Sequence, residues 1–310
     1  MLTNPNAKPF EKLFGKSTPA KAAGAAFSVV SVMLIATSII LAILMAGVTL
    51  MQGGTENPDW FVYLAYILPQ VSFAFAVCFA LAYQGIPVKS AIKSQKCHPK
   101  YFLVAIILQA GLMCLAEVNT WFLSLLGEIG YQDAGIPIPS LDGFGVVGVL
   151  FVIGVLPAVF EEFFFRGVFL NGVRSFKVWS AVLLCGAFFA LYHQNPAQTI
   201  YQFIVGSAFA LVAIRSGSVF PTVLSHFLNN ATIILLTKFG ISSFSPTTLW
   251  IMLPICAVCL IGSLVYLIFI DKNKPEQSLE TGEKQNLFKY ASAGIAVCGV
   301  AWLITLMSGM

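Results

Sequence analysis

Long apolar windows take up most of this 310-residue sequence and leave little chain between them. A helix needs about 20 apolar residues to cross the hydrocarbon core of a bilayer. Windows of about that length or longer lie near 22–51, 59–85, 101–126, 144–174, 178–195, 197–214, 218–237, 248–270 and 287–308. The apolar fraction of 58% also exceeds the roughly 45–50% of soluble domains. The chain is therefore predicted to be all-α, a polytopic transmembrane helical bundle of eight or nine spans.

The windows follow one another without a gap large enough for a soluble domain, and no period of 20–50 residues repeats. We expect a cytoplasmic N-terminal segment at 1–21 and a single membrane domain at 22–308. The first window is too long for the apolar region of a signal peptide and lacks a clean small-residue cleavage site. It is interpreted as an uncleaved first helix.

Lysines are concentrated in alternate loops, and their placement predicts the orientation of the bundle. Four lie before the first window and four between the second and third, whereas the intervening loops near 52–59 and 127–143 carry only acids. The positive-inside rule then places the N-terminus in the cytoplasm. The net charge of +4 comes from these loops and fits contact with a lipid bilayer, with no nucleic acid as a partner.

The seven cysteines fall mostly inside apolar windows, where cysteine acts as a small hydrophobic residue. No disulfide is expected. Cys256 and Cys259 have the spacing of a redox or zinc motif, but no second ligand pair accompanies them and they lie in mid-span, which favours packing.

A few ionisable and amide side chains stand inside apolar windows, and they form one candidate site. Charges at membrane depth are costly unless paired or hydrated, so they indicate function. The set consists of Glu161, Glu162, Arg166, His193, His226 and Asn230. Residues four apart share a helix face. Glu162 is therefore expected to pair with Arg166, which leaves Glu161 to face a polar cavity as a general base.

The two histidine segments can complete such a site. His193 follows Glu161 by 32 residues, enough for a turn and an antiparallel return, so it can bind the same water. The two meet at one depth if the fourth helix continues to about Arg174 and tilts, and Pro196 predicts a break after His193. His226 and Asn230 share a helix face and offer N–H donors for an oxyanion. Together these roles suit peptide hydrolysis.

The three motifs resemble those of the CPBP family, which includes type II CAAX prenyl proteases and bacteriocin-processing enzymes. The resemblance covers about 145–240 and rests on Glu161-Glu162-x-x-x-Arg166, Phe189-x-x-x-His193 and His226-x-x-x-Asn230. It implies that Glu161 and His193 activate water and that His226 and Asn230 stabilise the oxyanion, with Glu162 and Arg166 in supporting roles. It also implies a membrane-associated peptide or protein substrate and a bacterial plasma membrane.

A metal is the first open alternative at this site. Glu161, His193 and His226 could bind zinc, but zinc proteases usually supply two histidines four residues apart on one helix, and these are 33 apart. A metal-free mechanism with glutamate-activated water is favoured, and no other cofactor is expected.

Other readings remain open for the chain and for single residues. A non-catalytic immunity or scaffold protein would tolerate loss of Glu161, and a proton-coupled transporter should show paired repeats, which are not found. The charged residues could merely hold helices together, His193 could be a structural core histidine, and Asn230 could bond helices together. His98 is interpreted as a surface residue, and Glu117 with Asn119 as an interfacial or bracing pair.

Overall fold

Helices make up the regular structure of this computed structural model, which describes residues 17–52, 58–86, 96–133, 135, 137–273 and 283–310. The described part contains no strand. The helical segments in chain order are α2 (Pro19–Gln52), α3 (Asp59–Gln84), α5 (Lys100–Leu112), α6 (Leu115–Glu128), α7 (Gly145–Val149), η1 (Leu150–Val155), α8 (Leu156–Glu162), η2 (Phe163–Phe169), α9 (Leu170–Gly172), α10 (Val178–Tyr192), η3 (Pro196–Gln198), α11 (Thr199–Ser216), α12 (Phe220–Lys238), α13 (Pro246–Val265), η4 (Tyr266–Ile270) and α14 (Glu283–Ser308). The all-α prediction is confirmed.

Each of the nine apolar windows corresponds to one helix or to a run of consecutive helical segments. Within the described ranges, seven helices are long and apolar enough to cross a membrane. The upper predicted count of nine spans is reached only when two further helices, which fall short of those limits, are included. The first is α10, whose 15 residues extend about 22 Å at 1.5 Å per residue, less than the thickness of a hydrocarbon core. The second is α12, where His226, Asn229 and Asn230 interrupt the apolar sequence.

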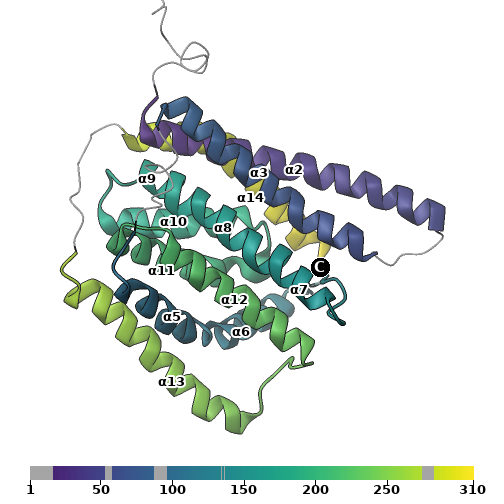
Figure 1. Cartoon of the computed structure of the whole chain (residues 1–310). Helices are drawn as coiled ribbons and strands as arrows, with labels where there is room; N and C mark the ends of the chain where they lie inside the picture. The colour runs from purple at the N-terminus through teal and green to yellow at the C-terminus, as the bar shows by residue number, and fades with distance from the viewer. Residues whose placement is uncertain (1–16, 53–57, 87–95, 134, 136, 274–282) are drawn as a thin grey trace, which may run out of the picture.

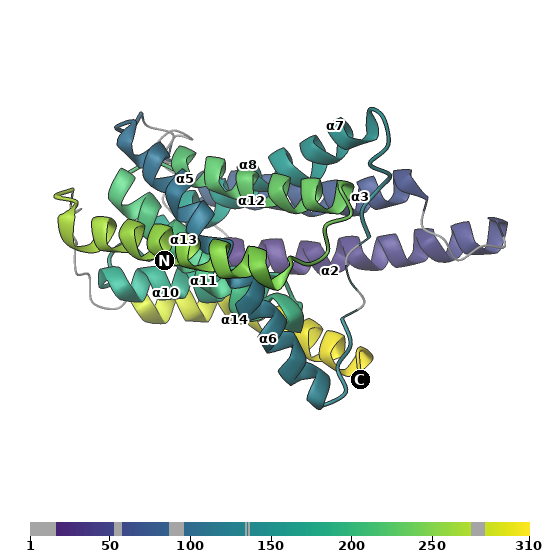
Figure 2. The ribbon, with the colours of Figure 1, turned by 90° about the horizontal axis from the view of Figure 1, so that it is seen from below.

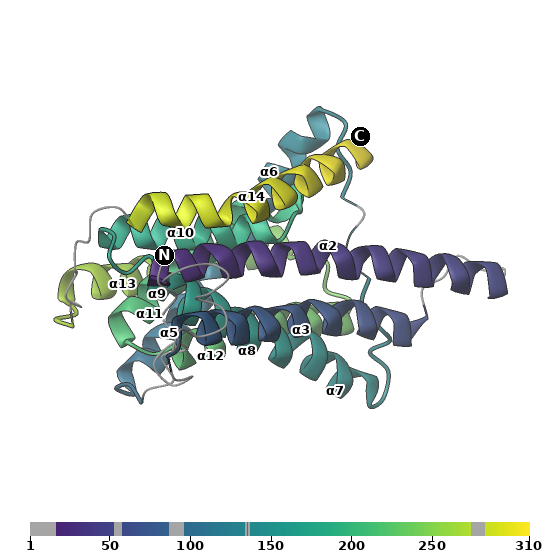
Figure 3. The ribbon, with the colours of Figure 1, turned by 90° about the horizontal axis from the view of Figure 1, so that it is seen from above.

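The helices form layers. α2 packs against α3 and α14 on one side of the molecule, and α13 packs on α5 at the opposite side, with α8, α10, α11 and α12 between them (Figure 1). The C-terminal part of α2 continues past the other helices (Figures 2 and 3). The side chains of Ile39, Ile43 and Leu50 are exposed there. An outward apolar surface of this kind suits contact with lipid.

The core contains a cluster of buried aromatic rings around η2. The rings of Phe73, Phe165 and Tyr192 pack together, with centroids 4.5–6.0 Å apart. Phe164, Phe169, Phe188 and Phe189 extend this group, and we call these seven residues the aromatic cluster. The cluster joins α3, η2 and α10, which are distant in sequence. It fills the part of the bundle that surrounds η2, between the glutamates of α8 and Arg174.

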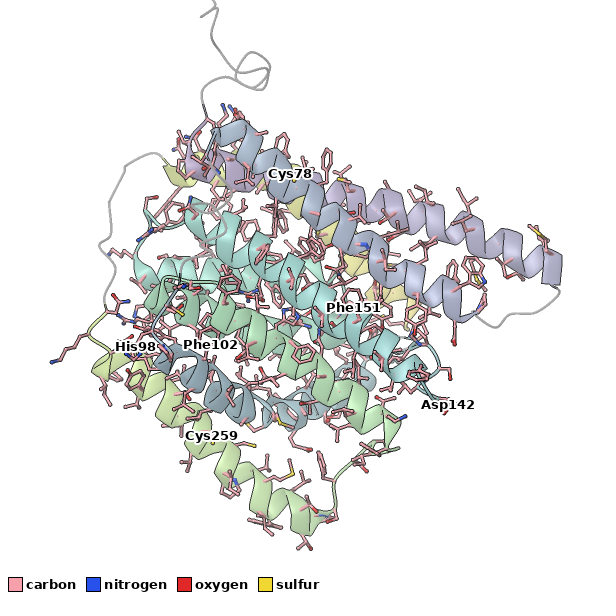
Figure 4. The ribbon with its side chains drawn as sticks, in the orientation of Figure 1. Cys78, His98, Phe102, Asp142, Phe151 and Cys259 are labelled. Atoms are coloured by element: carbon pink, nitrogen blue, oxygen red, sulfur yellow. The ribbon has the colours of Figure 1, made fainter. Side chains whose placement is uncertain are left out.

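Several side chains weighed in the sequence lie away from this core. His98 is exposed beside the start of α5, and Cys78 and Cys259 lie on different helices (Figure 4). All seven cysteines lie in the described part of the chain, and none of them is in a disulfide. At the end of η4, Asp271 accepts hydrogen bonds from Lys100 at 3.0 Å and from Tyr101 at 2.8 Å, which links this end of the bundle to α5. Burial alone would raise the pKa of Asp271, but these hydrogen bonds hold it below its usual value.

The helices α10 and α11 approach each other closely at Gly186. A methyl group added there would lie 2.6 Å from the carbonyl oxygen of Phe203 and would also collide with the side chain of Ser207. On the facing helix, Gly206 has the Cα of Gly186 only 3.0 Å from its own Cβ position. Small residues therefore allow the contact between these two helices.

We predict that Gly186→Ala destabilises the folded protein by about 1–3 kcal/mol, because the methyl group meets backbone atoms that cannot move away independently. Chemical unfolding of the purified protein in detergent would measure the loss. Gly262→Ala is the matched control, since its added methyl group meets nothing within 4 Å. Equal stability of the two variants would contradict the close approach.

Candidate active site

The two glutamates lie on α8, a short α-helical segment between the π-helical segments η1 and η2. Pro157, near the start of α8, has no N–H to donate to the carbonyl of Ile153 four residues earlier. The side chain of Asn230 donates to that carbonyl instead, over 3.0 Å. This bond joins α12 to the segment that carries the glutamates, and π-helical turns often accompany functional sites.

Glu162 forms a buried ion pair with Arg166. The Nη1 of Arg166 donates to Oε1 of Glu162 over 2.8 Å, and neither side chain is exposed to solvent. The pairing agrees with the four-residue spacing, even though Arg166 already belongs to η2. A second guanidinium nitrogen donates to the backbone carbonyl of Gly206 on α11 over 3.1 Å, and the ring of Phe189 lies 4.5 Å from the guanidinium carbon.

His226 contacts the same carboxylate oxygen. Its Nδ1 lies 3.0 Å from Oε1 of Glu162. A carboxylate paired with arginine only accepts hydrogen bonds, so Nδ1 of His226 carries the hydrogen. The Nε2 atom is left for the cavity, where it is a donor when His226 is an imidazolium ion. The contact of His226 with Glu162 was not foreseen from the sequence, which linked the histidine only to Asn230.

His193 stands at the end of α10, where the chain turns before η3. Its Nδ1 lies 2.7 Å from the carbonyl oxygen of Phe189. A carbonyl only accepts, so Nδ1 is the donor and Nε2 keeps a free lone pair. The next residue, Gln194, has a φ of 52°, a left-handed conformation uncommon outside glycine. The break predicted from Pro196 is present at this turn.

Glu161 points the other way from Glu162 and lies on the wall of a cavity of about 770 Å³. Glu161 is 7% exposed, and its Oε2 atom has no hydrogen-bond partner among the described residues. An unpartnered buried carboxylate oxygen is costly unless it has a role. Adjacent helix positions point about 100° apart, which explains why neighbouring glutamates have such different surroundings.

The cavity brings together four residues from α8, the end of α10, and α12. Glu161, His193, His226 and Asn230 all lie on its wall, whereas Glu162 and Arg166 lie behind it. The ring of Phe189 separates the two imidazoles, with its centroid 4.7 Å from that of His193 and 6.2 Å from that of His226. The arrangement offers a carboxylate acceptor, an imidazole acceptor, and N–H groups within one enclosure.

Further polar residues on this wall were not singled out in the sequence. Asn229 accepts hydrogen bonds from Tyr201 at 2.6 Å and Gln109 at 2.9 Å, and it donates to Asn230 at 3.3 Å. Gln70, in the middle of α3, also lines the cavity. The sequence shows that these amides lie inside apolar windows, which marks them as unusual. It does not show which of them face the site.

A zinc ion needs three or four nitrogen, oxygen or sulfur ligands close together. Among the residues described, no three histidine, cysteine, aspartate or glutamate side chains are grouped closely enough to hold a metal ion. Glu161, His193 and His226 therefore do not form a ready zinc site in this arrangement.

A comparison with protein families bears on what this helical, membrane-type chain does. Residues 143–232 match the model of the family described as Type II CAAX prenyl endopeptidase Rce1-like. The match supports a CPBP-family intramembrane protease domain in this part of the chain. The match includes Glu161, Glu162, Arg166, His193, His226 and Asn230. Searches of curated proteins and of solved structures give no significant match.

We predict that Arg166→Met destabilises the fold by about 3–5 kcal/mol, because it leaves Glu162 as a buried charge without its cation. Unfolding of the solubilised protein would measure this. The double variant Glu162→Leu/Arg166→Met should lose less than the single one, since both charges are then absent. A single variant as stable as the unmodified protein would show that the pair has no structural importance.

Proposed function

We propose that the protein is an intramembrane endopeptidase in which Glu161 activates a water molecule for attack on a peptide bond. The observation that carries the proposal is the convergence of Glu161, His193, His226 and Asn230 on one cavity, with the Oε2 atom of Glu161 unpartnered. Membership of residues 143–232 in a protease family supports the reaction class. The substrate is a membrane-associated peptide or protein.

In the first step, water lies between Oε2 of Glu161 and Nε2 of His193, each of which accepts one of its hydrogens. Glu161 takes a proton as the water oxygen bonds to the peptide carbonyl carbon. His193 orients the water, because the Phe189 carbonyl keeps its hydrogen on Nδ1 and leaves Nε2 as an acceptor. The carbonyl oxygen gains negative charge in the tetrahedral intermediate.

In the second step, that oxyanion receives hydrogen bonds from His226 and Asn230. His226 donates through Nε2 in its doubly protonated form, in which Nδ1 keeps its contact with Glu162. The amide of Asn230 has two N–H bonds; one goes to Ile153 and the other serves the oxyanion. The C–N bond then breaks, and Glu161 returns its proton to the leaving amine.

The orientation follows from the lysine distribution: the N-terminus is proposed to lie in the cytoplasm. The cavity wall includes residues from the halves of helices that lie away from the lysine-rich loops, such as Ala65 and Ile233, and it extends to mid-helix residues such as Gln70 and Met113. It is therefore proposed to extend from the side that faces away from the cytoplasm to mid-depth. Residence in a bacterial plasma membrane stays a prediction.

We predict that Glu161→Gln lowers the turnover of a cleaved peptide by at least about 10²-fold, because the amide keeps the size of the side chain but not its basicity. Peptide cleavage by the purified protein in lipid nanodiscs, followed by mass spectrometry, measures this. Glu128→Gln is the control, since Glu128 is exposed and lies outside the cavity wall.

Two outcomes would reject this proposal. Cleavage by Glu161→Gln at the rate of the unmodified protein would remove Glu161 as the base. If the unmodified protein cleaves no peptide, and Glu161→Gln retains its cellular phenotype, the chain acts as a scaffold instead.

We further predict that Asn230→Ala lowers kcat by roughly 10²-fold, the usual effect of losing one oxyanion donor, while KM changes less. The same cleavage assay provides both constants. Thr232→Ala, on the same helix and also on the cavity wall, is the control. A change in KM alone would assign Asn230 to substrate binding.

A further inference from the structure

Apart from the two histidines, the residues of charged type on the described cavity wall are all acidic. They are Glu117 on α6, Asp133 in the loop after it, and the proposed base Glu161. No lysine or arginine among the described residues lies on this wall. Glu117 is half-buried and Asp133 is exposed, so these two carboxylates lie nearer to solvent than Glu161. A substrate with a negative charge at this end of the cavity would be repelled.

Basic side chains on adjoining elements have other contacts. Arg166 is fully buried and donates to Glu162 and to the carbonyl of Gly206. Lys238, at the end of α12, donates to the carbonyl of Leu141 over 2.8 Å. Neither residue lines the cavity. The described wall therefore has no cation to bind the free carboxylate at the end of a peptide.

The buried amides on the wall have unused acceptors. The Oε1 atoms of Gln70 and Gln109 have no hydrogen-bond partner, and these residues are only 5% and 4% exposed. Asn119 likewise has an unpartnered Oδ1 atom. Buried acceptors of this kind need donors. Water or a ligand in the cavity can supply the N–H or O–H donors, and the backbone N–H groups of an extended peptide are donors of this kind.

The cavity wall also has apolar residues. Phe244, Leu249, Met252 and Leu253 lie on it, in and just before α13, together with Ile233 of α12. A peptide in the cavity can thus place apolar side chains against α13 while its backbone N–H groups bond to the glutamines. This accounts for both kinds of surface with a single ligand.

We infer that the cavity takes an apolar peptide segment that carries a cationic nitrogen beside it, held by Glu117 and Asp133, and that recognition needs no free C-terminal carboxylate. The inference rests on the proposed function and narrows its substrate. The cation is a lysine or arginine side chain or a free amino terminus. Charge complementarity favours this class because the described wall offers carboxylates and neutral acceptors but no fixed cation.

The test measures binding of synthetic peptides to full-length Glu161→Gln protein in nanodiscs, so that cleavage does not interfere. The peptides share one apolar core and carry Lys, Gln or Glu beside it, each with a free or acetylated amino terminus and an acid or amide carboxyl terminus. At low salt we expect the Lys peptide to bind about 10-fold more tightly than the Glu peptide. Amidation should change affinity less than about 2-fold. Acetylation distinguishes a side-chain cation from a terminal one.

Adding Glu117→Gln and Asp133→Asn should remove most of the preference for Lys over Glu. The matched control adds Glu128→Gln and Asp142→Asn, which remove two charges from the same region but lie outside the cavity wall, and it should keep the preference. Equal binding of the three peptides, tighter binding of the Glu peptide, dependence on a free carboxylate, or no binding at all would overturn the inference. Charge-selective binding without cleavage by the unmodified protein would uphold it and reject the proposed function.

Discussion

The site depends on one buried carboxylate, that of Glu162. Its Oε1 atom receives hydrogen bonds from Arg166 and His226, and Arg166 also donates to the backbone of α11. Three chain segments therefore meet at a group that lies fully out of solvent. Removing a charge from such a cluster is costly, because the remaining ion has no water to replace its partner. Glu162 thus orients His226 while Glu161, next to it, stays available on the cavity wall.

Backbone irregularity serves the same arrangement. Pro157 cannot donate to Ile153, and that carbonyl instead anchors Asn230. At the end of α10, the Phe189 carbonyl binds Nδ1 of His193. In each case a backbone carbonyl at or beside an irregular helical segment orients a side chain of the site. Such irregular backbone is tolerated at membrane depth only where protein buries it or it borders a cavity, and both conditions hold here.

The helical class could be predicted from the sequence because window length alone determines which segments can span a bilayer. The pairing of Glu162 with Arg166 also followed from spacing, since four residues separate them. The contact of His226 with Glu162, and the polar chain through Asn229 and Tyr201, could not be predicted. These contacts depend on how helices distant in sequence pack together. The spacing of residues within one helix does not reveal that packing. The π-helical turns around α8 were missed for a related reason, because tertiary packing decides where a helix widens.

The aromatic cluster has a consequence for the membrane itself. A polar cavity that reaches mid-depth brings water close to the centre of the bilayer and shortens the path that an ion would have to cross. Phe164, Phe165 and Phe169 are completely buried and lie directly after the glutamates, on the side away from the cavity. Their rings place apolar surface beyond the cavity, where an ion would have to give up its hydration. The aromatic cluster therefore opposes the passage of ions through that part of the bundle.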